Sequence, residues 1–445
     1  MTSRSALDHD VMKKILVFTS DIVPLGGIAT SGGGLRSWQI IKGLQERGFD
    51  VTYSMPRDRF LRRLYRNDLS EEHTHRLWTD TNQDEIIRGE KPDVIVCVKP
   101  STLHWKKDHG IPVAMDFHGP DLMEYERIAC KPHALARFAI TTQKVLNIGQ
   151  GDFFTCAGNR QRYYFMAFLM MAGVDVSDLE IHYMPVAMSS DLPGRDPDLS
   201  RKSILFAGGF YPWLNPITGL GQLARVLEEI GAGHLDIFGG SHNTNRQETT
   251  TFDDFKRDMT RSPRVSFHGY VSREELIRRY SRAYAAFELM PCNPERELAF
   301  TTRTVEFLWA GLPVIYNDYA ELSELIDEYR AGWTVPADDP PALLEIVRGI
   351  MSNPDQVADR SANAQRLVRE HFVYDKVIEP LAQFCANPTR RKRYPENNFL
   401  IIPSRRPGYG YIDAVYSVYK RSSSGRFTWE LLAGAFGVIK RKLQA

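Results

Sequence analysis

The chain has 445 residues, enough for two full domains, because globular domains usually contain roughly 100–200 residues. Its 56 lysines and arginines nearly balance its 55 aspartates and glutamates, so no overall charge favours nucleic acid as a partner. The 5 cysteines are scattered along the chain and none has the CxxC spacing. We therefore expect neither a disulfide framework nor a zinc site, and a reducing compartment fits this cysteine usage.

Neither the start of the sequence nor its longest apolar run indicates a membrane-spanning protein. The first fourteen residues carry Asp8 and Asp10 and lack an apolar core, so they do not have the pattern of a signal peptide. The longest apolar run, Tyr163 to Val174, is shorter than the roughly 20 residues that a spanning helix needs. We expect a cytoplasmic protein that is at most peripheral at the inner face of a membrane.

Short apolar runs alternate with helical patterns along most of the chain, which is typical of parallel sheets with crossover helices. In the first part, a helix is predicted at 35–47, and strands are predicted at 14–19, 49–54, 93–98, 113–117 and 153–156. Residues 185–197 are rich in Pro, Gly, Asp and Ser and are interpreted as an interdomain linker.

The same alternation starts again after this linker. Strands are predicted at 203–207, 235–238, 265–267, 285–288 and 313–316, and helices at 220–230, 274–284 and 304–310. Two such sets predict an α/β fold of two facing, doubly wound Rossmann-like domains, with ligands at the carboxyl ends of the strands. The predicted domains are 1–187 and 188–388, with 371–388 crossing back to the first domain.

A basic and aromatic extension is predicted from residue 389 to residue 445. It opens with Arg390-Arg391-Lys392-Arg393 and ends in the aromatic-rich helical pattern of Phe427 to Leu443, which is too polar to span a membrane. Two interpretations remain open: peripheral contact with an anionic membrane that carries a lipid-linked acceptor, or packing of the tail against the two domains. The prolines and glycines that interrupt the segment favour packing.

Two motifs in the first domain have the residue types of a ligand site. Gly26 and Gly27, with three more glycines at 32–34, lie between the first strand and the first helix, where backbone amides can approach an anion or a sugar. This is not the GxGxxG spacing, and a plain tight turn is an equal alternative. His118 follows the strand that ends at 117. A lone histidine is more often structural, but the carboxyl end of a strand favours a role in ligand binding.

The stretch from Glu297 to Ile315 is the most informative part of the second domain. Arg303 and Glu306 lie three residues apart on one face of a predicted helix. Thr301 and Thr302 precede them, where free backbone amides at a helix start favour phosphate. The alternative is a surface ion pair that contributes only about 0.2–0.5 kcal/mol.

This stretch resembles the donor-site helix of GT-B glycosyltransferases, particularly the retaining GT4 family (glycosyltransferase group 1). Arg303, Glu306 and the sequence Gly311-Leu312-Pro313-Val314-Ile315 fit the family pattern in order and spacing. The resemblance implies that Glu306 holds the donor ribose and that Arg303 faces the diphosphate. It covers roughly Lys13 to Pro388.

Further segments resemble other parts of that family. Phe267 to Ser272, which contains Tyr270 and Val271, resembles the base-binding loop. Gly26-Gly27 resembles the loop beside the sugar phosphate, and His118 resembles the histidine beneath the donor sugar. By the same resemblance the donor-binding residues are expected to include those at the ends of the second domain's strands: Gly209, Asn215, Gly240, Tyr270, Val271, Thr301 and Thr302.

The chain departs from the family pattern at two places. The family's glutamate that contacts the transferred sugar would fall at Leu298, and Glu297 stands one residue earlier. Residues 208–215 hold neither the Arg nor the Lys that usually meets the diphosphate, so the phosphate charge would fall mainly on Arg303 and the helix amides. The expected catalytic residues are His118, Arg303 and Glu297.

The resemblance implies transfer of a sugar from a nucleotide diphosphate sugar to a glycan, lipid-linked or small-molecule acceptor, as in polysaccharide biosynthesis. Retention of configuration is implied, and we expect no metal and no cofactor beyond the donor substrate. A nucleotide-sugar epimerase, a phosphorylase and a catalytically silent binding subunit are alternatives on the same fold. The missing Arg/Lys pair and the displaced glutamate keep the silent subunit open.

Overall fold

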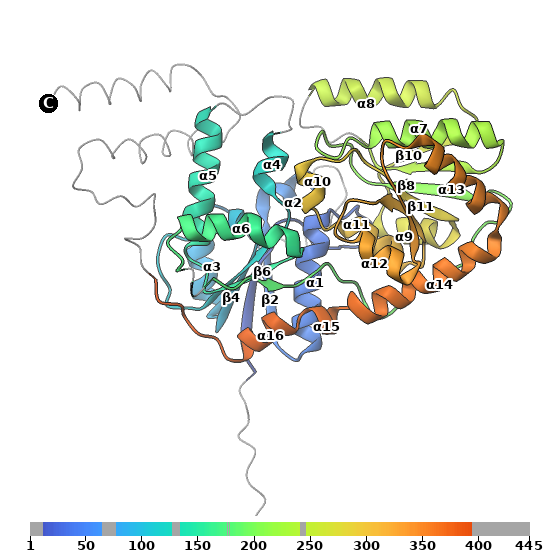
Figure 1. Cartoon of the computed structure of the whole chain (residues 1–445). Helices are drawn as coiled ribbons and strands as arrows, with labels where there is room; N and C mark the ends of the chain where they lie inside the picture. The colour runs from blue at the N-terminus through green and yellow to red at the C-terminus, as the bar shows by residue number, and fades with distance from the viewer. Residues whose placement is uncertain are drawn as a thin grey trace, which may run out of the picture.

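The structure is a computed structural model that describes residues 12–64, 77–126, 134–175, 177, 179–240 and 246–393. Two domains lie side by side, and each is built on one parallel sheet with helices packed against it (Figure 1). The predicted fold class of two doubly wound α/β domains is confirmed.

The first domain contains a parallel sheet of 7 strands in the order β3-β2-β1-β4-β5-β6-β7. Both faces of this sheet are buried, because alternate side chains of β1 enter different hydrophobic cores: Ile15 and Val17 in one, Leu16 and Phe18 in the other. The strands are β1 (Lys14–Phe18), β2 (Asp50–Pro56), β3 (Leu77–Trp78), β4 (Val94–Val98), β5 (Val113–Phe117), β6 (Phe153–Cys156) and β7 (His182–Tyr183).

Helices α1 to α6 connect these strands: α1 (Gly32–Glu46), α2 (Arg57–Leu64), α3 (Gln83–Glu90), α4 (Asp121–Glu126), α5 (Ala134–Ile148) and α6 (Asn159–Met171). Helix α1 begins where Ser31 accepts a hydrogen bond from the Gly34 amide at 3.1 Å, an N-cap that satisfies one free donor of the first turn. The glycine-rich segment is therefore the start of the helix.

The second domain contains a parallel sheet of 6 strands in the order β10-β9-β8-β11-β12-β13. Ile204 and Phe206 of β8 enter one core, and Leu205 and Ala207 enter the other, so this sheet too is covered on both faces. The strands are β8 (Ser203–Ala207), β9 (His234–Phe238), β10 (Val265–Gly269), β11 (Ala285–Glu288), β12 (Val314–Asn317) and β13 (Gly332–Val335).

The helices of this domain follow the same alternation: α7 (Pro216–Ile230), α8 (Arg246–Met259), α9 (Arg273–Arg282), α10 (Pro294–Leu298), α11 (Thr302–Trp309), α12 (Ser323–Tyr329), α13 (Pro340–Ser352) and α14 (Pro354–His371). The predicted strands all form, with ends shifted by a residue or two. The helix predicted from residue 220 begins earlier, at Pro216, because proline is well suited to the first turn, where its missing N–H costs nothing.

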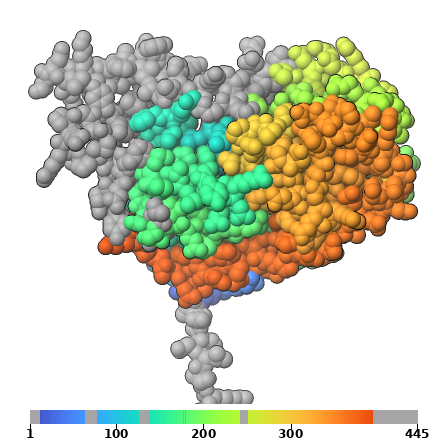
Figure 2. Space-filling view, in the orientation of Figure 1, coloured from blue at the N-terminus to red at the C-terminus, as the bar shows by residue number. Residues whose placement is uncertain are grey.

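After α14 the chain returns to the first domain. Met188 donates its amide to the Phe372 carbonyl at 2.8 Å, and the Met188 carbonyl accepts from the Tyr374 amide at 3.1 Å, so the two crossing segments run side by side. Helices α15 (Tyr374–Val377) and α16 (Glu379–Ala386) then pack into the core of the first sheet. The space-filling view shows this orange segment against the first domain (Figure 2).

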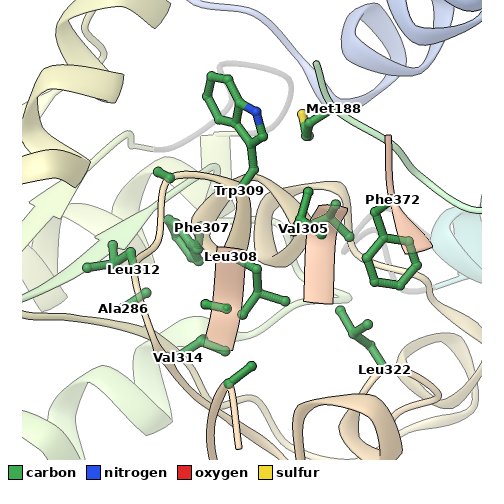
Figure 3. Close-up of a cluster of buried hydrophobic side chains, with 14 of the residues drawn as sticks. Met188, Ala286, Val305, Phe307, Leu308, Trp309, Leu312, Val314, Leu322 and Phe372 are labelled. Carbon is green, nitrogen blue, oxygen red and sulfur yellow. The ribbon is translucent and has the colours of Figure 1, made fainter. Parts of the chain in front are cut away.

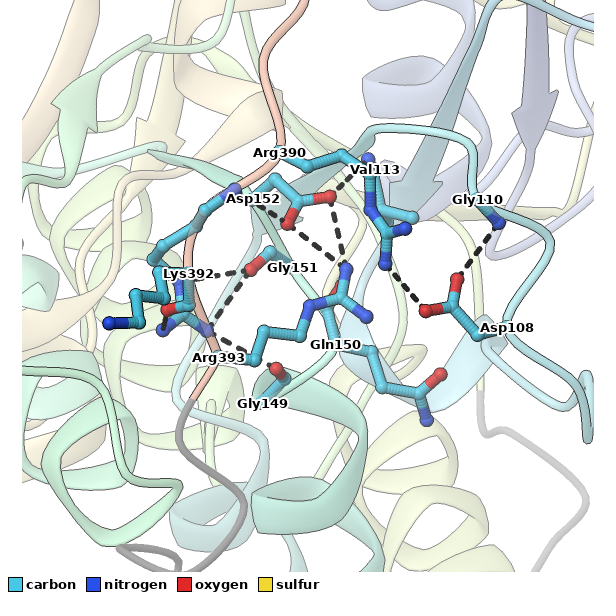
Figure 4. Close-up of polar contacts among 11 residues, drawn as sticks. Asp108, Gly110, Val113, Gly149, Gln150, Gly151, Asp152, Arg390, Lys392 and Arg393 are labelled. Atoms are coloured by element: carbon cyan, nitrogen blue, oxygen red, sulfur yellow. Dashed lines mark hydrogen bonds and ion pairs between the residues drawn. The ribbon is translucent and has the colours of Figure 1, made fainter.

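Residues 390–393 fasten the chain to the first domain just beyond α5 (Figure 4). Arg393 contacts both carboxylate oxygens of Asp152 at 3.0 Å and the Gln150 carbonyl at 2.7 Å. Arg391 donates to the Gly149 carbonyl at 3.2 Å, and Arg390 pairs with Asp108 at 2.6 Å. Cations are favourable at these carbonyls because they follow a helix C-terminus.

The predicted aromatic segment Phe427 to Leu443 lies outside the described residues, as does everything from residue 394 onward. Within the described ranges, no helix is long and apolar enough to cross a membrane.

Candidate active site

The site lies where the helix starts and strand ends of the two domains meet. Gly32, the first residue of α1, marks this meeting point. A β-carbon built on Gly32 would lie 3.5 Å from Oγ1 of Thr302 and 4.0 Å from Nε2 of His118. The start of α1, the end of β5 and the start of α11 are therefore brought together from both domains.

The end of β5 is held by a buried ion pair that the sequence analysis missed. The Arg36 guanidinium binds both carboxylate oxygens of Asp116, at 2.7 and 3.0 Å, and the carbonyls of Met184 and Pro185. Both charged side chains are almost completely buried, and Thr155 donates a further hydrogen bond to Asp116 at 2.7 Å. A buried charge pair whose hydrogen bonds are all made gives this strand end one fixed geometry, two residues before His118.

His118 is neutral at physiological pH. Burial lowers its pKa well below the ordinary value, and the positive charges of Lys99 and Arg36 lower it further. Its Nδ1 atom is buried and makes no hydrogen bond within the described part of the chain. A buried polar atom left unpaired is costly, and such atoms are expected where a ligand supplies the partner.

The glycine loop of the first domain is closed onto helix α9. Ile28 accepts a hydrogen bond from the Arg273 amide at 3.1 Å. The pKa of Glu274 is lowered, first by its own amide and also by the Ser272 hydroxyl and the Gly27 amide. Gly27 has a φ of +79°, a conformation that favours glycine, whereas a β-carbon on Gly26 would meet nothing within 4 Å. The Gly27 amide, predicted to face the donor, is bound here to a carboxylate of the other domain.

Arg303 packs against Gly208, the glycine that directly follows β8. A β-carbon on Gly208 would come within 2.4 Å of the Arg303 guanidinium carbon, which also stacks 5.0 Å from the centre of the Phe206 ring. Its Nη1 atom is buried without a hydrogen-bond partner among the described residues, and the nearest carboxylate oxygen, on Glu288, is 3.9 Å away. This guanidinium has free capacity to bind an anion.

The start of α11 is fixed by a hydroxyl network and by packing. Thr301 donates to Thr304 at 2.7 Å, and Thr304 donates to the buried Glu288 carboxylate at 2.6 Å. Thr301 also lies 3.1 Å from the Tyr316 hydroxyl. On the opposite side, Val305 and the residues after it enter the core shared with the crossing segments (Figure 3). The amides of the first turn are therefore held in place.

Glu306 is paired within the second domain. Its carboxylate lies 2.9 Å from Nη2 of Arg273 and accepts a hydrogen bond from the Tyr280 hydroxyl at 3.3 Å. Oε1, the oxygen that faces Arg273, makes no hydrogen bond within the described residues. Glu306 is therefore held by a guanidinium and a hydroxyl of its own domain, and its carboxylate oxygens have further lone pairs that can accept from a ribose hydroxyl.

The remaining predicted donor residues line the ends of β8, β9 and β10. Gly209 lies under Tyr211, since a β-carbon there would come within 2.5 Å of that ring, and Tyr211 stacks on Trp213 at 4.5 Å. Tyr270 is 55% exposed and donates its hydroxyl to the Gly240 carbonyl at 2.9 Å. Asn215, with a φ of +43°, precedes the first turn of α7, and Val271 packs at the edge of the core.

Glu297 differs from the other predicted residues. Its side chain is exposed on α10, where it contacts the thiol of Cys292. Its neighbour Glu295 is buried and bound to Arg296 at 2.5 and 2.6 Å. The structure gives Glu297 no contact with His118 or Arg303.

Sequence reasoning missed several charged residues that stand beside the site: Arg36, Lys99, Glu124, Arg273 and Glu288. Two of them have a signal in the sequence, because Lys99 directly follows β4 and Glu288 ends β11, and parallel strands place functional side chains at their carboxyl ends. In the described part of the chain, no three His, Cys, Asp or Glu side chains are grouped as metal ligands.

Residues 201–353, most of the second domain, match a family model described as "Glycosyl transferases group 1". No curated protein sequence matches the chain. Three solved structures share the two-domain fold. A sucrose-phosphate synthase from Thermosynechococcus elongatus has a TM-score of 0.62 and 14% identity, over 84% of this chain and 98% of that one.

HepE from Anabaena, solved in complex with UDP, has a TM-score of 0.58 and 13% identity, over 84% of this chain and 99% of that one. A glycosyltransferase from Rickettsia africae has a TM-score of 0.55 and 13% identity, over 85% and 100% of the two chains. The second domain thus matches a glycosyltransferase family model, and both domains share the two-domain fold of these solved structures.

Proposed function

We propose that the protein transfers a sugar from a nucleotide diphosphate sugar bound to the second domain onto an acceptor bound to the first. The observation that carries this proposal is the Arg303 guanidinium, whose buried Nη1 atom has no hydrogen-bond partner among the described residues. It lies beside the amides that open α11, and an arginine at a helix start is suited to phosphate.

In this proposal, Arg303 and the amides of the first turn of α11 stabilise the charge that develops on the leaving diphosphate. Fixed donors of this kind stabilise a transition state well, because they need no reorganisation as the charge appears. No divalent ion is then required, and turnover should persist in EDTA. His118, neutral and with one unpaired nitrogen, holds a hydroxyl of the donor sugar or of the acceptor.

The acceptor class and the stereochemistry are part of the same proposal. Retention of configuration follows from the resemblance to the retaining family, and NMR of the product's anomeric proton tests it. A glycan or lipid-linked acceptor is proposed for the first domain. Because Arg390, Arg391 and Arg393 bind the first domain, we attribute to them attachment of the tail rather than contact with a membrane.

Uridine diphosphate sugars are the first donors to test. HepE has been solved with UDP and with UDP-glucose. In this chain, the exposed Tyr270 ring offers a surface for the base, and the Glu306 carboxylate offers an acceptor for the ribose. The proposed binding surface therefore combines an aromatic ring for the base, a carboxylate for the ribose and a guanidinium for the diphosphate.

The proposal is tested by thermal shift and by donor hydrolysis with a panel of nucleotide sugars, in wild type and in Arg303→Ala and Glu306→Ala. One nucleotide sugar should stabilise the wild type and be slowly hydrolysed, and both variants should lose these effects. Binding without hydrolysis, even with acceptors present, would indicate a silent binding subunit. Conversion of the donor sugar without any acceptor would indicate an epimerase.

A further inference from the structure

Lys99 stands at the carboxyl end of β4 in an unusual backbone conformation. Its φ is +72° and its ψ is +138°, a region that side chains other than glycine's rarely adopt. Three hydrogen bonds impose this geometry: the Lys99 amide donates to the Asp116 carbonyl at 2.9 Å, and its carbonyl accepts from the amide and the hydroxyl of Thr102. Backbone strain that the surroundings enforce in this way is concentrated at functional sites.

The ammonium of Lys99 has no ion pair or hydrogen bond among the described residues. Its positive charge nevertheless shifts the pKa values of two nearby side chains. It lowers the pKa of His118, and it opposes the rise in the pKa of Glu124 that burial causes. The Lys99 amide is bound to the Asp116 carbonyl, two residues before His118, so Lys99 lies beside the end of β5. Lys99, His118 and Glu124 all belong to the first domain, on the ends of β4 and β5 and on α4.

Glu124 reaches from α4 towards the second domain. Its Oε1 atom would be 3.0 Å from a β-carbon on Gly119, so the carboxylate is folded back over the residue that follows His118. Helix α4 contacts α10 of the other domain, and the negative charge of Glu295 on α10 raises the pKa of Glu124. The negative charge of Glu124 also raises the pKa of Tyr211, and the positive charge of Arg303 lowers it. The Glu124 carboxylate thus lies beside the residue that follows His118, on a helix that packs against α10 of the second domain.

We propose that Glu124 binds hydroxyl groups of the transferred sugar, with Lys99 as a second residue of the first domain that contacts the same hydroxyls. This inference rests on the proposed function and extends it to a residue of the first domain. Leu298 has no carboxylate at the position where the family's sugar-binding glutamate is expected, and Glu124 supplies one from the first domain. A sugar hydroxyl that donates to Glu124 and accepts from Lys99 satisfies both charges at once.

The test separates the sugar from the rest of the donor. Calorimetric titrations of wild type and Glu124→Gln are made with UDP-glucose and UDP, and with GDP-mannose and GDP. The variant should bind the nucleoside diphosphates as the wild type does, and should bind the wild type's preferred nucleotide sugar about ten- to a hundred-fold more weakly, the range expected for a hydrogen bond to a charged group. Lys99→Met should weaken the same ligand, and Lys99→Arg should restore part of the loss.

Glu85→Gln, the same change at an exposed position on α3, controls for the loss of one negative charge, and unfolding temperatures confirm that each variant is folded. Equal nucleotide-sugar affinity in wild type and Glu124→Gln would overturn the inference while leaving the proposed function intact. A loss confined to Glu297→Gln would also overturn it. If the wild type binds neither diphosphates nor nucleotide sugars, the proposed donor site is wrong, and this inference is wrong as well.

Discussion

The guanidinium of Arg303 rests directly on the α-carbon of Gly208, with no room for a side chain between them. A β-carbon at that position would come within 2.4 Å of the guanidinium carbon and of Nη2. Beneath it, a β-carbon on Gly239 would meet the Gly208 carbonyl at 2.0 Å. Two glycines at adjacent strand ends thus create the space in which the proposed phosphate-binding arginine lies.

Gly208→Ala should therefore displace Arg303 and weaken nucleotide binding about tenfold or more, with a stability cost of about 1–3 kcal/mol for the added methyl group. Isothermal titration with the preferred nucleotide sugar measures the first effect, and chemical unfolding measures the second. Gly221→Ala is the matched control, because a β-carbon on Gly221 in α7 meets nothing within 4 Å. Unchanged binding in Gly208→Ala would show that the position of Arg303 is not important for the donor.

The Arg36–Asp116 pair offers a stability prediction. Arg36→Met leaves the buried Asp116 carboxylate without its partner, and such uncompensated charges cost about 3–5 kcal/mol. Urea unfolding of the first domain should reveal this loss. Arg88→Met, at an exposed position on α3, should change stability by less than about 0.5 kcal/mol. A similar small effect for Arg36→Met would mean that the pair does not hold the end of β5.

His118 gives a prediction about pH. Its pKa in the folded protein is well below that of the unfolded chain, so the unfolded chain binds more protons below about pH 6.5. The free energy of unfolding should therefore fall as the pH is lowered from about 6.5 towards the depressed pKa. His118→Gln should remove this part of the pH dependence. Parallel slopes for wild type and variant, between pH 7 and pH 5, would contradict a buried neutral His118.

Glu321 links the second domain to the first. Its carboxylate accepts hydrogen bonds from the amides of Asn159 and Arg160 at 2.8 and 3.0 Å, and so caps the start of α6 from the other domain. Glu321→Ala should cost about 0.5–2 kcal/mol, as the loss of a helix cap does, and should loosen the contact between the domains. Unfolding and small-angle scattering measure the two effects. Glu328→Ala, at an exposed position on α12, is the control. An unchanged scattering profile in Glu321→Ala would show that Glu321 does not hold the two domains together.

The order of strands and helices could be predicted from the sequence, because each buried strand is a short apolar run flanked by a helical pattern. The short edge strands β3 and β7 could not, since two residues such as Leu77–Trp78 give no periodicity. Gly26 and Gly27 were recognised as a loop, but their contact with Glu274 depends on how the two domains meet, which no local pattern encodes.

In the candidate site, too, residues within one element could be predicted, and residues brought together by packing could not. Arg303 and Glu306 could be found because their spacing lies within one helix. Lys99 and Glu124 come from different elements, and their proximity to His118 arises only when β4, β5 and α4 are placed side by side. The sequence predicts a catalytic role for Glu297 from its position, and no sequence pattern indicates that Glu297 is exposed on α10 while Glu295 is buried.

The central claim is that the second domain binds a nucleotide diphosphate sugar through Arg303. Isothermal titration of wild type and Arg303→Met against the same donor panel tests it most directly. Removing a charge-assisted contact should weaken the preferred nucleotide sugar by at least about tenfold, while the unfolding temperature stays close to that of the wild type. Equal affinity in the two proteins, or no binding of any nucleotide sugar to the wild type, would contradict the account.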